Sequence, residues 1–253
     1  MNTFITNRLS SIQYNDAREL ISQCKEHDGT RGVSFLEPEL NADREFPCFY
    51  LMYDGVKLVS LLSVFVADDN QCEIYGCTSV EHREKGYFRR LLNDALKNIK
   101  KWNIENILLV NEPESKAGAA VLEKLSATLV SSEFLMSYDM SVTPMPLNKL
   151  DLRVQKDENT KLFAAYLADE QVGSCNVEFT RSHGVIYDFQ IFPEYRGNGY
   201  GTELLLLILK HLIENDIEKI LLHVNGANTA AHAMYSHHGF VSEEQLDYWM
   251  LTQ

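Results

Sequence analysis

The amino-acid sequence predicts an α/β (α+β) chain of two similar domains, each a mixed, mostly antiparallel sheet flanked by helices. Two internal repeats are the basis of this prediction. The segment from Arg83 to Phe88 lies 113 residues before a similar segment from Arg196 to Gly201. The segment from Asn103 to Asn111 is matched almost residue by residue by the segment from Asp216 to Asn225, once His223 is treated as an insertion. This period is the size of a whole domain and exceeds the roughly 20–50 residues of solenoid repeats.

The length of 253 residues is comfortable for two domains. Pro144 and Pro146 stand close together and interrupt any regular element, which indicates a linker. We therefore expect an N-terminal domain at residues 1–146 and a C-terminal domain at residues 147–253.

In the first half, strands and helices alternate. The turn residues Asp54 and Gly55 between two apolar runs indicate a β-hairpin, and branched residues favour a short buried strand after the second helix. The expected elements are a helix at 16–25, strands at 48–53, 57–66 and 72–79, a helix at 87–101, a strand at 107–110, a helix at 117–125 and a strand at 133–142.

The second half repeats this order with a shorter beginning. About fifteen residues separate the linker from its first predicted strand, whereas about fifty residues precede the hairpin of the first half. The second domain therefore lacks the early helices. The expected elements are strands at 162–168, 172–179 and 185–192, a helix at 200–214, a strand at 220–224, a helix at 229–237 and a strand at 248–251.

Composition and charge exclude several classes of protein. Hydrophobic residues make up 45% of the chain and charged residues 23%, as in globular proteins. The formal net charge of −13 disfavours nucleic acid and membrane surfaces as partners and weakly favours a cationic ligand. No apolar run reaches the roughly 18 residues of a membrane span, and the first twenty residues lack the apolar core of a secretion signal.

The five cysteines are odd in number and form no CxxC pair. They indicate a reduced thiol set, so the expected location is cytoplasmic. Their spacing does not suit a zinc site, and His232, His237 and His238 lack an i, i+4 pair. We therefore expect no metal.

A glycine-rich loop from Arg196 to Gly201 follows a predicted strand and opens a predicted helix. Glycines let the backbone approach a ligand closely, and the free amides at a helix start attract a phosphate. The helix dipole and the charge of Arg196 add to this attraction. The pattern therefore predicts an anion-binding loop; a plain glycine-rich surface turn is the alternative.

Two motifs carry a resemblance to a known family. The loop from Ile191 to Gly201 resembles the acetyl-CoA pyrophosphate loop, Q/R-x-x-G-x-G/A, of the GCN5-related N-acetyltransferase (GNAT) superfamily. The segment from Asn225 to Phe240 resembles that family's second motif, N-x-x-N-x-x-A-x-x-x-Y-x-x-x-G-F. The resemblance covers the second half fully and the first half in degraded form, so it implies two tandem acetyltransferase-like domains.

The resemblance implies acyl transfer from acetyl-CoA to a primary amine by direct attack, without a covalent enzyme intermediate. It assigns the pyrophosphate to the loop amides, the pantetheine and the thioester carbonyl to the backbone of Ile191, and a place near the sulfur to Tyr235. The implied cofactor-binding residues are Ile191, Phe192, Arg196, Gly197, Asn198, Gly199, Tyr200, Gly201, Thr202 and Asn228.

Elementary chemistry agrees with these roles. A phenol with a pKa near 10 can donate to the departing thiolate, so Tyr235 is the expected donor, with core packing as the alternative. The attacking amine must lose a proton to a base or a water relay. Asp188 is the expected base and Glu178 the second candidate, although either can be a solvated strand residue. His183 beside Gly184 is expected to face solvent.

The first half departs from the pattern. Phe88 occupies the last small position of the loop, and Glu84 and Lys85 replace the second copy's Gly197 and Asn198. The position of Tyr235 maps to Val121, or to Lys124 in a second alignment, and Asn228 maps to Glu114. We therefore expect the first copy to be catalytically silent.

The predicted function is thus N-acetylation of a small-molecule or protein amine in the second domain. Polyamines, aminoglycosides and protein amino groups are all compatible with the acidic surface. The alternative is a non-catalytic acyl-CoA sensor or protein-interaction module. A dinucleotide-binding domain is disfavoured because the loop follows antiparallel strands, with no acidic residue ending a second strand about 20 residues later. The sequence does not indicate the oligomeric state.

Overall fold

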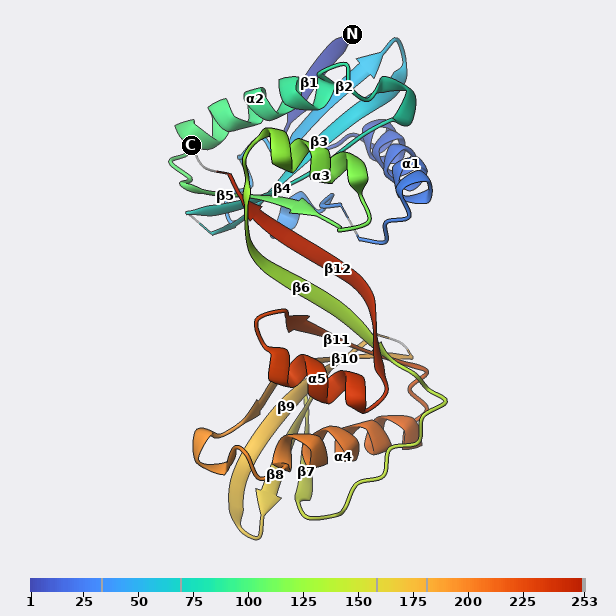
Figure 1. Cartoon of the computed structure of the whole chain (residues 1–253), viewed down its shortest axis with the longest axis vertical. Helices are drawn as coiled ribbons and strands as arrows, with labels where there is room; N and C mark the ends of the chain where they lie inside the picture. Colours follow the sequence, from blue (N-terminus) through green and yellow to red (C-terminus); the bar gives the residue numbers. More distant parts are fainter. Residues whose placement is uncertain (33, 69, 158, 181, 252–253) are drawn as a thin grey trace. The chain divides into compact units, whose positions relative to one another are not determined.

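The computed structural model describes residues 1–32, 34–68, 70–157, 159–180 and 182–251. By its contacts the chain forms two compact units (Figure 1). The first unit comprises Met1–Ser132 with Gln245–Gln253, and the second comprises Glu133–Glu244. Each unit contains a sheet with helices packed on it, which confirms the predicted fold class.

In the first unit the sheet order is β1-β2-β3-β4-β5-β12, where β12 is Phe240–Met250, and β4 and β5 are its parallel pair. Its elements are β1 (Asn2–Thr6), α1 (Ser11–Asp28), the short helix η1 (Pro38–Leu40), β2 (Phe49–Asp54), β3 (Lys57–Asp68), β4 (Gln71–Thr78), the short helix η2 (Val80–His82), α2 (Tyr87–Lys101), β5 (Asn106–Asn111) and α3 (Lys116–Lys124).

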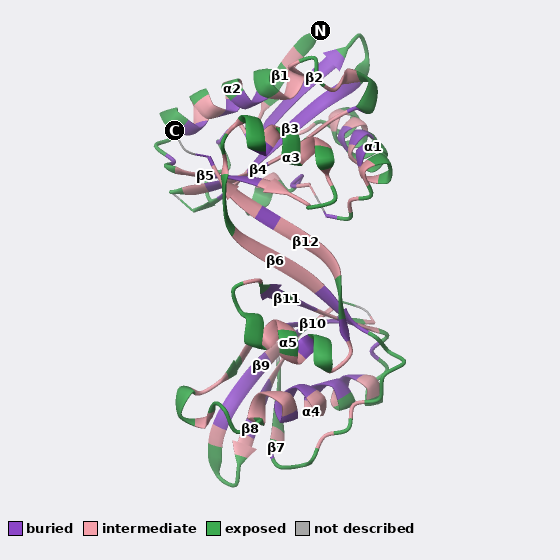
Figure 2. Cartoon of the chain, in the orientation of Figure 1, coloured by how far each residue is buried: buried purple, intermediate pink, exposed green. Residues whose placement is uncertain are grey.

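Local chemistry explains where α1 begins and ends. The Ser10 hydroxyl accepts from the Gln13 amide, and the Gln13 side chain accepts from the Ser10 amide, which forms a capping box. At the other end, Gly29 adopts φ 72° and donates to the carbonyl of Lys25. Both α1 and α2 pack on β3, whose central residues are buried on both faces of the sheet (Figure 2).

In the second unit the sheet order is β6-β11-β10-β9-β8-β7, and β10 and β11 are its parallel pair. Its elements are β6 (Thr128–Tyr138), β7 (Asp151–Asp157), β8 (Thr160–Leu167), β9 (Glu170–Thr180), β10 (His183–Ile191), the short helix η3 (Pro193–Tyr195), α4 (Tyr200–Glu214), β11 (Lys219–Asn225), α5 (Thr229–His237) and β12 (Phe240–Met250).

The last strand of each sequence repeat ends in the unit of the other repeat. Residues 133–137 of β6 pair with β11 in the second unit, and residues 247–250 of β12 pair with β5 in the first. Each parallel pair therefore gains an antiparallel neighbour from the other half of the chain.

Because of this exchange, the bounds of the observed units differ from those of the expected domains at 1–146 and 147–253. Residues 133–146 belong to the second unit and residues 245–253 to the first. Two further strands, β1 and β7, were not expected, and β12 is eleven residues long where four were predicted.

The linker after β6 is held by a buried carboxylate of α4. Glu203 is only 3% exposed, and its two oxygens accept from the backbone amides of Leu147 and Lys149 at 2.9 Å each. A buried charge is stable only when it is hydrogen bonded in this way. The core beneath contains five apolar residues of the same helix: Leu204, Leu205, Ile208, Leu209 and Leu212.

Candidate active site

The strand before the glycine loop of the second unit contains a β-bulge. The pairing of β10 with β9 shifts between Tyr187 and Gln190, and Asp188 adopts φ 49°, which is uncommon for a residue other than glycine. Across the sheet, a Cβ atom on Gly173 would lie 2.5 Å from the carbonyl oxygen of Gln190, so only glycine fits there. Strained backbone of this kind is often concentrated at functional sites.

The bulge directs successive side chains of β10 differently. Asp188 is exposed and accepts from the Asn176 side-chain amide at 3.3 Å. The ring of Phe189 contacts the ring of Tyr235 edge-on, with centroids 6.0 Å apart. Among the described residues, no hydrogen bond joins Asp188 to Tyr235, and the second base candidate, Glu178, is exposed on β9.

The loop after β10 is shaped by its own side chains. The Arg196 Nε donates to the carbonyl of Ile191 at 2.9 Å, and the Asn198 side-chain amide donates to the carbonyls of Tyr195 and Arg196 at 3.1 Å. Gly197 and Gly199 adopt φ 78° and 79°, the left-handed region that favours glycine. Of the implied binding residues, Phe192 uses its amide within the sheet, donating to Val172 at 2.9 Å.

The loop and the first turn of α4 present a row of unused donors. The first helical hydrogen bond runs from the Glu203 amide to the Gly199 carbonyl, at 3.1 Å. In the described part of the chain, the six amides from Gly197 to Thr202 meet no protein acceptor. Together with the positive end of the helix dipole, free amides of this kind are suited to hold an anion such as a diphosphate.

Gly201 and Tyr200 belong to this turn. A Cβ atom on Gly201 would lie 3.4 Å from the sulfur of Met234 on α5, so a small residue lets the two helices approach closely.

Helix α5 brings two further predicted residues to the second unit. The Asn228 side chain caps this helix by accepting from the Ala231 amide at 3.2 Å. Tyr235 is the one buried residue of α5, with 5% of its surface exposed. Its ring packs against those of Phe189 and Phe240. Burial raises the pKa of Tyr235 to about 12, so its phenol stays protonated at neutral pH.

The first unit keeps the shape of the loop with different residues. Glu84 and Gly86 adopt φ 61° and 79°. The Arg83 Nε donates at 3.1 Å to the carbonyl of Thr78, five residues earlier, just as the Arg196 Nε donates to the carbonyl of Ile191. However, the guanidinium of Arg83 is also paired with the Asp28 carboxylate of α1, at 2.8 and 2.7 Å. Hydrogen bonding to Asp28 raises the pKa of Arg83, so the ion pair persists.

The structure corrects the alignment of the two copies beyond this loop. Ser115 caps α3 by accepting from the Gly118 amide, as Asn228 caps α5, so Ser115 replaces the expected counterpart Glu114. Seven residues further, Leu122 is the single buried residue of α3, as Tyr235 is of α5. Val121 and Lys124 were therefore the wrong counterparts. The counterpart Val121 came from treating His223 as an insertion, and Lys124 from aligning Val130 with Val241, whereas the 113-residue offset continues through both helices.

Two hollows in the first unit were not predicted from the sequence. One of about 100 Å³ lies between α1, β4 and the end of β5, and is lined by Cys24, Cys77 and Asn111 among others. A larger one of about 330 Å³ adjoins it, since Ser34 and Tyr75 line both. Their walls come from segments that lie far apart in the sequence, so no local sequence pattern indicates them.

Comparison with known proteins agrees with this geometry. The model of the Acetyltransferase (GNAT) family matches residues 131–240. An acetyltransferase of Sodalis glossinidius is 32% identical over 103 residues, which are 40% of this chain and 67% of that relative. The chain belongs to the GNAT family. It is therefore an acetyltransferase of an acyl-CoA-dependent family whose members acetylate amine acceptors.

Other relatives of this GNAT chain match over shorter stretches or by fold alone. A mycothiol acetyltransferase of Thermobispora bispora is 40% identical over 57 residues, 22% of this chain and 19% of that relative. A GCN5-related N-acetyltransferase of Sphaerobacter thermophilus matches with a TM-score of 0.78 at 14% identity, over 99% of this chain and 96% of that one.

A tandem GNAT protein from the clavulanic acid biosynthesis pathway matches with a TM-score of 0.69 at 13% identity. The match covers 100% of this chain and 99% of that one. These structures establish the tandem GNAT fold of this chain.

Two further findings apply to the described residues of this GNAT chain. None of their helices combines the length and apolarity needed to cross a bilayer. No group of three or more His, Cys, Asp or Glu side chains among them is arranged to hold a metal ion.

Proposed function

We propose that the second unit transfers an acetyl group from acetyl-CoA to a primary amine, by direct attack and without a covalent enzyme intermediate. The observation that carries this proposal is a difference between the two copies. Both have the anion-binding loop, but only the second follows it with a buried phenol, because Leu122 replaces Tyr235 in the first. A thiolate leaving group needs a donor, and leucine has none.

Each residue of the second unit has one proposed role. The amides from Gly197 to Thr202 and the charge of Arg196 bind the diphosphate of acetyl-CoA, which supplies the activated acetyl group when bound. Asn228 positions the start of α5 beside this ligand. Asp188 takes the proton of the attacking amine, directly or through a water molecule, and Tyr235 donates its proton to the sulfur as the carbon–sulfur bond breaks.

A second function, binding of an acyl-CoA by the first unit without turnover, is favoured by one observation. Glu84 is held in the left-handed region at φ 61°, where glycine would be unstrained, so the anion-binding shape of the loop persists there despite its cost. Lys85, Arg89 and Arg90 lie along this loop and the first turn of α2. Such a site would bind without catalysis.

The matched variants Gly199→Ala and Gly86→Ala distinguish the two sites. Both glycines have φ 79°, and alanine would be strained by about 1–2 kcal/mol in either loop. Thiol release from acetyl-CoA should be measured with a panel of polyamines, aminoglycosides and lysine peptides. We expect Gly199→Ala to raise the KM for acetyl-CoA about tenfold or more, and Gly86→Ala to leave the KM unchanged. A loss of turnover in Gly86→Ala alone would place the chemistry in the first unit.

A further inference from the structure

Two cysteines of the first unit are in contact although they lie far apart in the sequence. Cys24 belongs to α1 and Cys77 to β4, and the thiol of Cys77 donates a hydrogen bond to the sulfur of Cys24. In its own thiol form, Cys24 donates to the carbonyl of Thr78 at 3.4 Å. The packing of α1 on β4 therefore brings two nucleophilic side chains together.

The surroundings stabilise the thiolate of Cys24. The hydrogen bond from Cys77 lowers the pKa of Cys24 to about 7 although burial opposes this, and Arg83 adds to the lowering by a hydrogen bond and by its charge. The charge of Asp28 opposes the lowering and has the smallest of these effects. The same hydrogen bond raises the pKa of Cys77, which therefore keeps its proton. About half of the Cys24 side chains are thus thiolates at neutral pH, and the thiolate is the form that reacts with oxidants.

The other three cysteines have different surroundings. Cys48, Cys72 and Cys175 are buried, and burial raises the pKa of each thiol. They are therefore protonated at neutral pH and react slowly with oxidants. Cys24 is also buried, with 5% of its surface exposed, so the partner thiol and the guanidinium distinguish it from them, and not its exposure.

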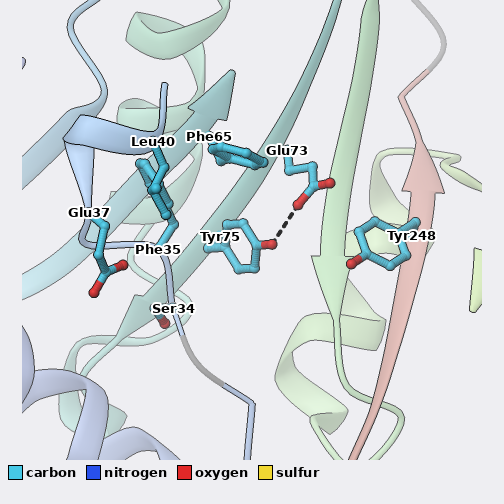
Figure 3. A pocket seen from close by; sticks show the side chains of 8 residues that line it. All are labelled: Ser34, Phe35, Glu37, Leu40, Phe65, Glu73, Tyr75 and Tyr248. Atoms are coloured by element: carbon cyan, nitrogen blue, oxygen red, sulfur yellow. Dashed lines mark hydrogen bonds between the residues drawn. The ribbon is translucent and has the colours of Figure 1, made fainter. Parts of the chain in front are cut away.

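Both thiols of the pair line the smaller hollow of the first unit, whose volume is about 100 Å³. A water molecule takes up roughly 30 Å³ in the liquid, so hydrogen peroxide fits into this hollow. The larger hollow beside Glu73 adjoins it, since Ser34 and Tyr75 line both (Figure 3). A small oxidant therefore has space beside the sulfur of Cys24.

We propose that Cys24 and Cys77 form a redox site at which a small hydroperoxide converts the two thiols into a disulfide between α1 and β4. The Cys24 thiolate attacks one oxygen of hydrogen peroxide, so that a sulfur–oxygen bond forms and the oxygen–oxygen bond breaks. The departing hydroxide takes up a proton and leaves as water, and Cys24 has become a sulfenic acid.

Cys77 completes the reaction. Its sulfur attacks the sulfur of the sulfenic acid, the disulfide bond forms, and the sulfur–oxygen bond breaks. The hydroxide that leaves takes the proton of Cys77 and becomes the second water molecule. Two thiols and one peroxide thus give one disulfide and two molecules of water, with the sulfurs oxidised and the peroxide reduced.

This site goes beyond the proposed function, because it requires neither acetyl-CoA nor the second unit. The disulfide would tie α1 to β4 and suppress openings in which this helix leaves the sheet. Its formation is measured on the full chain without acetyl-CoA, so the result does not depend on whether acetyl transfer takes place.

The test treats the reduced full chain with one equivalent of hydrogen peroxide at neutral pH, alkylates the remaining thiols under denaturing conditions and maps the products by mass spectrometry. A protease that cuts after glutamate separates Cys72 from Cys77, because Glu73 lies between them. We expect a link from Cys24 to Cys77, formed at least about tenfold faster than the three other cysteines are oxidised and reversed by dithiothreitol. Amide exchange in residues 11–28 of the oxidised chain should slow at least about tenfold.

Matched variants assign the two steps. In Cys77→Ala no disulfide should form, and Cys24 should stop at the sulfenic acid, which dimedone traps. Cys72→Ala is the control, because it removes another thiol of the same strand, and it should leave the yield of the disulfide unchanged.

Three results would overturn the proposal. They are a link from Cys24 to a cysteine other than Cys77, oxidation of Cys24 no faster than that of Cys48, and an equal yield of the disulfide in the chain unfolded by guanidinium. All three use the unmodified chain, so they decide the question even if a variant does not fold.

Discussion

Tyr235 and Leu122 occupy equivalent positions of the two units, and both are buried in their cores. The packing requirement alone is satisfied by either side chain. A phenol adds a hydroxyl that core packing does not require. This difference between the two units is the reason why we propose Tyr235 as the acid.

The substitution Tyr235→Phe tests this residue. It keeps the ring against Phe189 and Phe240 and removes only the hydroxyl. We expect kcat to fall about 100-fold, the lower range for loss of a general acid, with the dissociation constant of acetyl-CoA nearly unchanged. Tyr138→Phe is the control, since it removes another phenol from the same core, one that donates to the Val142 carbonyl at 2.7 Å. An unaltered kcat in Tyr235→Phe would remove the residue from the mechanism.

Cys24 is a second residue with a testable property, the reactivity of its thiol. A hydrogen bond from Cys77 lowers the pKa of Cys24 to about 7, against the effect of burial, and Arg83 adds to this lowering. Since the thiolate is the reactive form, alkylation of Cys24 by a small reagent that enters the 100 Å³ hollow should accelerate as the pH rises, reach half of its maximum rate near pH 7 and level off about one pH unit higher.

Burial raises the pKa of Cys48 and of Cys72 to about 12, so these thiols serve as internal controls and should stay unmodified up to pH 9. Rates are read by mass spectrometry of the tryptic peptides. Cys77→Ala should shift the midpoint for Cys24 upward. A midpoint that does not move in this variant would show that the hydrogen bond has no such effect.

At the scale of elements, the bounds of a helix could be predicted wherever its own segment contains both a start residue and an apolar stripe. Helices α2, α4 and α5 begin and end at the predicted residues, because a glycine or a capping side chain marks the start of each and an apolar stripe follows. The loops before α2 and α4 were placed by the repeat alone. The fold class and the position of the glycine-rich loop at the start of α4 could therefore be predicted from sequence.

The rest depends on partners far away in the chain. The middle of β12, Glu243 to Gln245, is polar and indicates a loop, whereas the structure has one continuous strand there. β7 consists largely of charged and polar residues and is recognisable only through its register with β8. The bulge at Asp188 and the hollow beside Glu73 likewise arise from tertiary contacts, so no local pattern revealed them.

At the scale of the whole molecule, the exchange of the last strands determines which residues make up each compact unit. The core of the first unit includes Leu251, and Trp249 packs against it. Both residues follow the rest of that core by more than a hundred residues in the sequence. The core of the second unit likewise includes Met136 and Tyr138, which precede the linker. A fragment cut at the predicted boundary, residues 147–253, lacks these two side chains and the strand that pairs with β11, so we do not expect it to represent the second unit.

Truncation of the chain after Glu244 tests this exchange. The segment removed pairs with β5 from Asp247–Asn111 to Met250–Leu108, and the Leu251 amide donates to the Ile107 carbonyl at 2.9 Å. Its loss exposes the edge of β5 and removes Leu251, whose burial is worth about 2 kcal/mol. Amide exchange in β4 and β5 should therefore accelerate at least about tenfold relative to a control chain that ends at Leu251, while β8 and β9 keep their rates. If β5 retained full protection without residues 245–253, the last strand would not be part of the first unit.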